Sequence, residues 1–86
     1  MKDVERILKA LANGRRLRIV KFLARKKKAS VGDIAEEIKL SFKSTSRHLS
    51  ILANAGVLTK EQESLTVWHE LASPRHAIVT KVLEFV

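Results

Sequence analysis

The 86-residue sequence predicts a mainly α-helical fold with one small β-hairpin, in the order α-α-α-α-β-β-α. Two observations predict this fold class. Before Gly56, apolar side chains recur every three or four residues, which is the spacing of one buried helical face. From Leu65 to Leu71 they alternate with polar ones, as in a half-buried strand. A chain of this length supports one hydrophobic core, so we expect a single domain over residues 1–86.

The first two helices are predicted from their apolar stripes and from the residues at their ends. The first stripe consists of Val4, Ile7, Leu8 and Leu11. Gly14 interrupts the helical pattern, and Asn13 before it is a favourable N-cap for a second helix. The wide apolar face of that helix consists of Leu17, Ile19, Val20, Phe22, Leu23 and Ala24. We expect this helix to end in the basic run from Arg25 to Lys28.

Two short helices follow, joined by about three residues. Ser30 and Ser41 are each placed to cap one of them, because a serine hydroxyl accepts a hydrogen bond from a free N–H group of the first turn. Their inner faces consist of Val31, Ile34, Ala35 and Ile38, and of Thr45, His48, Leu49 and Leu52. Gly56 supplies the left-handed residue that ends the second helix of the pair. Two short helices on a tight turn are a helix-turn-helix candidate.

The hairpin and a last helix complete the prediction. Val57 to Thr59 favours one strand, and the second strand has an apolar face of Leu65, Val67, His69 and Leu71. Trp68 is expected to pack in the hairpin or in a dimer core. Ser73-Pro74 predicts the start of the last helix, because proline is favoured at the first helical position. The apolar stripe of that helix consists of Ile78, Val79, Val82, Leu83, Phe85 and Val86.

The charge is strongly positive and unevenly distributed. Seventeen Lys and Arg against nine Asp and Glu give a net charge of +8. Between Arg15 and Lys28 there are only basic charged residues, namely Arg15, Arg16, Arg18, Lys21, Arg25, Lys26, Lys27 and Lys28. Such a field attracts polyanions such as nucleic acid, although a solvated surface that keeps the protein soluble explains it equally well. Arg15 and Arg16, at the start of a helix, are predicted phosphate contacts.

The outer face of the fourth helix predicts a DNA-reading surface. It carries hydrogen-bond donors and two cations but no acid, whereas an ordinary exposed helix face carries mixed charges. In a major groove, Arg47 can pair with guanine O6 and N7, and Lys43 can reach guanine or phosphate. His48 falls on the inner face and is expected to be packed and hydrogen-bonded. The predicted recognition residues are Ser41, Lys43, Ser44, Ser46, Arg47 and Ser50.

The order of these elements and four stretches of sequence resemble the ArsR/SmtB family of winged helix-turn-helix repressors. The stretches are Leu11 to Val20, Val31 to Glu36, Ser46 to Leu52 and Ala55 to Leu58. The resemblance implies a winged helix-turn-helix fold and a homodimer that binds an imperfect palindrome in double-stranded DNA and represses transcription. It implies dimer contacts by the first and last helices, through Val4, Ile7, Leu8, Ile78, Val82 and Phe85.

The sequence departs from that family at two sites. Its metal-sensing members carry a Cys-containing motif on the third helix, but this chain has no Cys. We predict no metal and no cofactor, although zinc binding by His69, Glu70 and His76 stays open because these residue types are competent ligands. Family wings carry several Arg residues, whereas this hairpin offers Lys60 as its one predicted phosphate contact, beside Glu61 and Glu63.

Other functions are weighed against sequence-specific binding. An architectural protein that binds DNA without sequence preference, or a protein-interaction module with a winged fold, would also suit the composition. No nucleophile elbow, phosphate loop or pair of acids indicates an enzyme. No run approaches the roughly 20 apolar residues that span a bilayer, and the N-terminal residues lack the apolar run followed by small residues that marks a signal peptide. We therefore expect a cytoplasmic protein with no membrane partner.

Overall fold

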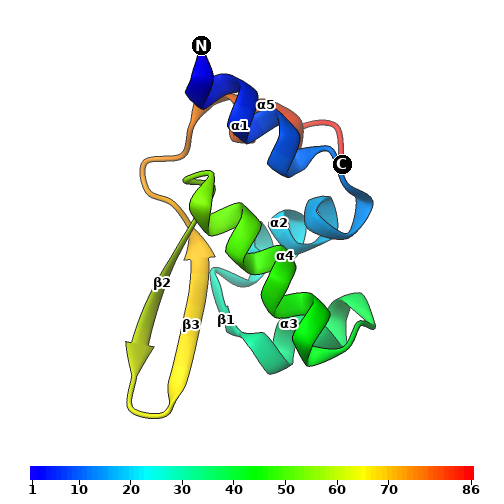
Figure 1. Cartoon of the computed structure of the whole chain (residues 1–86), viewed down its shortest axis with the longest axis vertical. Helices are drawn as coiled ribbons and strands as arrows, with labels where there is room; N and C mark the ends of the chain where they lie inside the picture. The colour runs from blue at the N-terminus through cyan, green and yellow to red at the C-terminus, as the bar shows by residue number, and fades with distance from the viewer.

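Five helices and one three-stranded antiparallel sheet form the structure, a computed structural model that describes all 86 residues (Figure 1). The helices are α1 (Lys2–Leu11), α2 (Gly14–Lys26), α3 (Val31–Ile38), α4 (Phe42–Asn54) and α5 (Ala77–Leu83). The strands are β1 (Lys28–Ser30), β2 (Leu58–Glu63) and β3 (Thr66–Leu71). The predicted class, mainly α with a small hairpin, is confirmed. None of the helices has the length and apolar character needed to cross a lipid bilayer.

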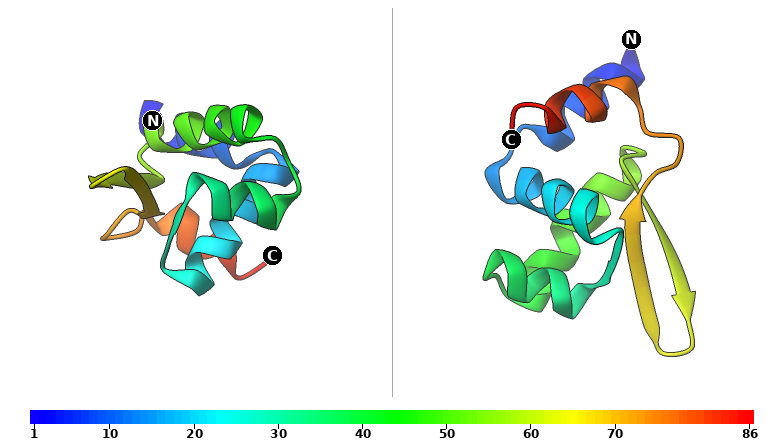
Figure 2. Two further views of the ribbon diagram at one scale, coloured as in Figure 1. Left: turned by 90° about the horizontal axis from the view of Figure 1, so that it is seen from below. Right: turned by 180° about the vertical axis from the view of Figure 1, so that it is seen from behind.

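The core lies where α2, α3 and α4 meet the base of the hairpin. Its fully buried side chains include Ile19, Leu23, Ile34, Ile38, Leu49 and Leu52. At one end of the molecule α1 and α5 lie side by side, while β2 and β3 project away from the helices at the other end (Figure 2). This arrangement leaves one side of α4 and the hairpin facing solvent together.

The predicted starts of α2, α3 and α4 are confirmed by their N-caps. The Asn13 side-chain oxygen accepts hydrogen bonds from the backbone N–H groups of Arg15 and Arg16. Ser30 Oγ accepts one at the start of α3, and Ser41 Oγ accepts one from the Ser44 backbone N–H at 3.1 Å. Gly56 follows α4 with a φ of 80°, in the left-handed region that glycine adopts without a steric cost.

Strand β1 was not predicted from the sequence. It pairs antiparallel with β3, so that the strand order is β1-β3-β2. Ala29 lies opposite His69 and has no exposed surface. A three-residue strand with one apolar residue has too few positions to show an alternation. The basic run therefore does not simply end α2, because its last residue, Lys28, begins this strand.

Two further predictions at the C-terminal side were wrong. The last helix begins at Ala77 rather than after Ser73, and its N-cap is His76, whose Nδ1 accepts the Ile78 backbone N–H at 3.0 Å. Leu65 is not on the buried face of a strand, because it lies in the turn between β2 and β3 and is almost fully exposed. An N-cap needs only a side-chain atom that accepts a hydrogen bond. The His76 ring supplies this acceptor, although the Ser73-Pro74 pair is the more usual signal for the start of a helix.

Candidate nucleic-acid interface

Helix α4 is fixed by its inner face and leaves its outer face free. Thr45, Leu49 and Leu52 are buried against the rest of the molecule. Because side chains three or four residues apart share a helical face, Lys43, Arg47 and Ser50 are exposed on the opposite side. Of the other predicted recognition residues, Ser41 is exposed, and Ser44 and Ser46 are partly buried. The helix contains no Asp or Glu, so an anion approaching this face meets no like charge.

The first turn of α4 is open to solvent. Ser41 uses its hydroxyl to cap the backbone N–H of Ser44, which leaves the other N–H groups of this turn directed outward. Phe42 begins the helix with a side chain that is 63% exposed. Free N–H groups together with the helix dipole favour a bound phosphate at this position.

Arg15 and Arg16 occupy different surroundings at the start of α2. Arg15 is exposed and has no side-chain partner. The Arg16 guanidinium donates through Nε to the Ala10 carbonyl at 2.6 Å and lies 3.2 Å from Nδ1 of His48. It therefore links α1, α2 and α4, and it has fewer donors left for a phosphate than the sequence suggested. The expectation that His48 is packed and hydrogen-bonded agrees with this contact.

The strand register separates the charges of the hairpin onto two faces. Residues paired across strands share a face, and the buried pair Leu58 and Leu71 marks the inner one. Lys60, two residues after Leu58, is on that inner face and lines a groove beside α4. The acids are on the outer face, at Glu61, Glu63 and Glu70. Lys60 therefore faces α4, whereas the acidic residues are on the face of the hairpin directed away from α4.

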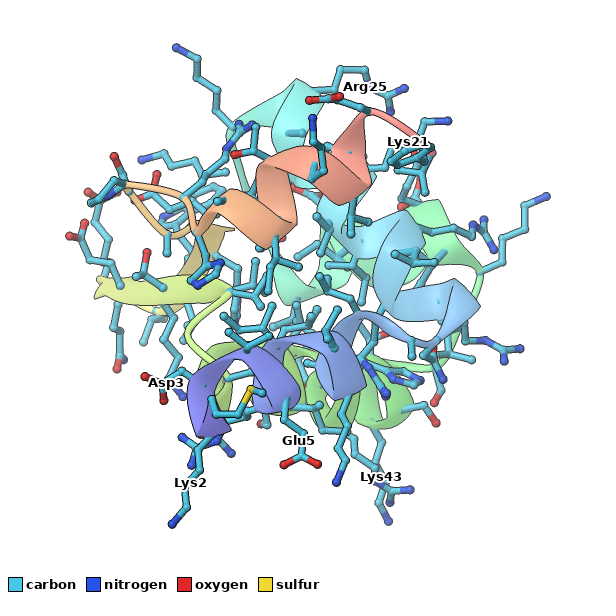
Figure 3. The ribbon with its side chains drawn as sticks, turned by 90° about the horizontal axis from the view of Figure 1, so that it is seen from above. Lys2, Asp3, Glu5, Lys21, Arg25 and Lys43 are labelled. Carbon is cyan, nitrogen blue, oxygen red and sulfur yellow. The ribbon has the colours of Figure 1, made fainter.

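The rest of the basic segment lies apart from this surface. Figure 3 shows Lys21 and Arg25 on one side of the molecule and Lys43 on the opposite side. Arg25 pairs with Glu37 at 3.8 Å, and its guanidinium lies over the ring of Phe22. Lys28 lies over the Trp68 ring, with Nζ 5.2 Å from the ring centroid. This placement argues against a continuous basic stripe along α2 and α4.

The three residues left open as a zinc site do not come together. His69 and Glu70 are neighbours on β3, so their side chains point to opposite faces of the sheet. His76 caps α5 through Nδ1. No group of three or more His, Cys, Asp or Glu side chains has a geometry that could hold a metal ion.

The predicted dimer residues divide into buried and exposed ones. Ile7 is buried in the core of its own chain, which leaves it little surface for a partner. Val4, Ile78 and Val82 are partly buried. Leu8 on α1 is 49% exposed and Phe85, just after α5, is 83% exposed. Two residues that were not predicted, Met1 and Val86, add exposed apolar surface.

Comparison with known proteins identifies the family. Residues 13–60 match the family model described as bacterial regulatory protein, arsR family. The chain belongs to the ArsR family. The match begins at the cap of α2 and ends at Lys60 of the hairpin, so it contains the helix-turn-helix and the start of the wing. Membership of a family of regulatory proteins also confirms that the chain is not an enzyme.

Two relatives are similar to this ArsR-family chain over most of its length. The transcriptional activator HlyU of Vibrio cholerae is 37% identical over 67 residues, which are 78% of this chain and 61% of that protein. The arsenical resistance operon repressor of Bacillus subtilis is 32% identical over 71 residues, covering 83% of this chain and 68% of the repressor. The chain thus spans less than two thirds of the length of HlyU and about two thirds of the length of the repressor.

The structural neighbours confirm the winged helix-turn-helix fold. The structure of reduced HlyU from Vibrio cholerae gives a TM-score of 0.82 over 98% of this chain and 84% of that one, at 31% identity. A possible ArsR-family regulator from Mycobacterium bovis, described as a homodimeric winged helix-turn-helix DNA-binding domain, gives 0.83 at 28% identity over 98% of this chain and 74% of that one. The β2–β3 hairpin is accordingly the wing.

Proposed function

We propose that the chain is a transcriptional regulator that recognises specific sequences in double-stranded DNA with α4. The observation that carries this proposal is the exposed, acid-free face of that helix. Arg47 is the residue best suited to a bidentate contact with a guanine, and Lys43 can reach a guanine or a phosphate. The hydroxyls of Ser46 and Ser50 supply donors and acceptors to base edges or backbone oxygens.

The phosphate contacts in this proposal surround α4. Arg15, the first turn after Ser41 and Lys60 all stand apart from the acids of the wing. Each contact with a phosphate releases counterions, so affinity for any duplex falls as salt rises. These groups set the orientation of α4 on DNA, while the side chains of α4 supply the sequence preference.

The regulator acts as a homodimer in our proposal. Leu8 and Phe85 leave apolar surface exposed at the end where α1 and α5 lie side by side (Figure 1), and the Mycobacterium bovis neighbour is described as homodimeric. Two-fold symmetry would place the two α4 helices in successive major grooves about 34 Å apart, on an imperfect palindrome. A cytoplasmic dimer bound over a promoter would repress by occlusion, as the word repressor in the name of the Bacillus subtilis relative suggests.

Selection of bound duplexes from a random library tests this function. We expect an imperfect palindrome whose half-sites are about one helical turn apart, bound at least about 1,000-fold more tightly than a scrambled duplex at the same salt. Equal, strongly salt-dependent affinity for both duplexes would identify an architectural protein instead. Absence of salt-sensitive duplex binding would identify a protein-interaction module.

A further inference from the structure

A groove of about 270 Å³ separates α4 from the inner face of the wing. Its walls come from α4, from the start of α3 and from both strands of the hairpin. Five of the nine lining residues are apolar and none is acidic. The polar groups in the groove are one ammonium, one imidazole and two hydroxyls, from Lys60, His69, Ser46 and Ser50. An anion in this groove would therefore meet donors and no like charge.

His69 is the most unusual member of this lining. The residue is 5% exposed, and its Nδ1 is enclosed by the protein. Burial, together with the Lys60 ammonium, lowers the pKa of His69, so the ring is neutral near pH 7 and Lys60 is the one cation in the groove.

We propose that this groove binds a small carboxylic acid with an apolar or aromatic body. Its carboxylate would meet the Lys60 ammonium and the Ser46 or Ser50 hydroxyl. Its body would lie on Val31, Phe42 and Val67, where the exposed Phe42 ring otherwise contacts water. The volume is just below the range of about 300 to 1,000 Å³ typical of ligand pockets, which suits a single-ring acid.

Such a ligand would regulate DNA binding. Ser46 and Ser50 line the groove and are also predicted recognition residues, so an occupied groove covers part of the reading face. This second step rests on the proposed function. The binding step does not, because it can be measured without DNA.

Benzoate titrated into the whole chain, followed by two-dimensional amide NMR, tests the binding step. We expect shifts confined to the groove, with benzyl alcohol, which has the same ring and no charge, binding at least about tenfold more weakly. Lys60→Gln should weaken benzoate binding at least about tenfold. Glu61→Gln, a charge change at the next position on the outer face, should leave it within about twofold. Inorganic phosphate should bind more weakly than benzoate.

Four results would overturn the proposal: equal binding of benzyl alcohol, an unchanged affinity in Lys60→Gln, shifts outside the groove, or phosphate binding as tightly as benzoate.

The regulatory step is tested with the selected duplex, whose affinity should fall at least about tenfold in saturating benzoate. Lys60→Gln, measured against its own affinity for the duplex without benzoate, should lose this response. If the chain binds no duplex in the absence of benzoate, the proposed function is refuted. The benzoate titration still tests whether the groove binds a carboxylic acid, because it does not involve DNA.

Discussion

Arg15 and Arg16 are neighbours in the chain, but their side chains have different roles. Arg16 is hydrogen-bonded to the Ala10 carbonyl and to His48, so Arg16→Gln should lower the free energy of unfolding by about 2 kcal/mol. Arg15 has no side-chain partner, so Arg15→Gln should change stability by less than about 0.5 kcal/mol. Urea denaturation measures both variants.

The same two arginine variants distinguish a phosphate contact from a structural contact when DNA binding is measured. Arg15→Gln should weaken binding to all duplexes and reduce the slope of log affinity against log salt by about 1. Equal stability of the two variants would contradict the role assigned to Arg16. An unaltered slope in Arg15→Gln would show that Arg15 does not contact a phosphate.

Two histidines make the stability depend on pH. Burial and the Lys60 ammonium lower the pKa of His69 from its ordinary 6.5, and the Val67 carbonyl only partly offsets them. Burial and the nearby guanidinium groups, first Arg16, lower the pKa of His48 in the same way. The unfolded chain therefore binds protons more readily than the folded chain. Stability should be full above about pH 7.5 and fall as the pH drops through 6.5.

Urea midpoints measured from pH 7.5 down to 5.5 check this dependence. His48→Gln and His69→Phe should each flatten the curve, since each removes one of the two groups with a lowered pKa. A midpoint that stays constant or rises on acidification would show that neither ring has a lowered pKa in the folded chain.

At the scale of elements, the turn from α4 into the wing depends on one glycine. Gly56 has a φ of 80°, and a side chain in this conformation is strained even though nothing lies within 4 Å of the position that a Cβ would take. Gly56→Ala should therefore destabilise the fold by about 1 kcal/mol. Gly32→Ala on α3 is the matched control, because its Cβ would meet only Ser30 Oγ at 3.9 Å and its backbone is helical. It should be neutral or stabilise by less than about 1 kcal/mol. Equal midpoints in thermal denaturation would contradict this account of the turn.

Elements with local signals could be predicted from the sequence. Asn13, Ser30 and Ser41 cap helices because each precedes an apolar stripe of helical spacing, and both signals lie within a few residues. Strand β1 could not be predicted, because it exists only through its pairing with β3 about 40 residues away. The start of α5 was misplaced because the His76 cap depends on a ring orientation that the sequence does not specify.

The same distinction holds for the candidate interface. The outer face of α4 follows from helical spacing, so Lys43 and Arg47 could be identified from the sequence. The contact of Arg16 with His48 joins residues 32 positions apart and has no local signal. The separation of Lys60 from Glu61 depends on the hairpin register, which a turn without glycine left open.

At the scale of the whole molecule, the exposed apolar end formed by α1 and α5 should hold the dimer together. Phe85→Asp places a charge at that end and should raise the dimer dissociation constant by at least about tenfold. Leu65→Asp makes a similar apolar-to-acid change at the exposed tip of the wing and should leave it unchanged. Sedimentation velocity over a range of concentrations measures both. A dimer unaffected by Phe85→Asp, or an unmodified chain that is monomeric throughout, would contradict this interface.

Recognition of DNA sequence by α4 depends most on Arg47, the residue suited to a bidentate contact with guanine. The most direct measurement is a random-library selection run in parallel for the unmodified chain, for Arg47→Ala and for Lys21→Ala, which removes an equal charge on the side opposite Lys43. We expect Arg47→Ala to lose preference at one base pair of each half-site, at a cost of about 1 to 3 kcal/mol, while Lys21→Ala selects the original sequence. An unchanged sequence preference in Arg47→Ala would contradict the role of α4 as the reading helix.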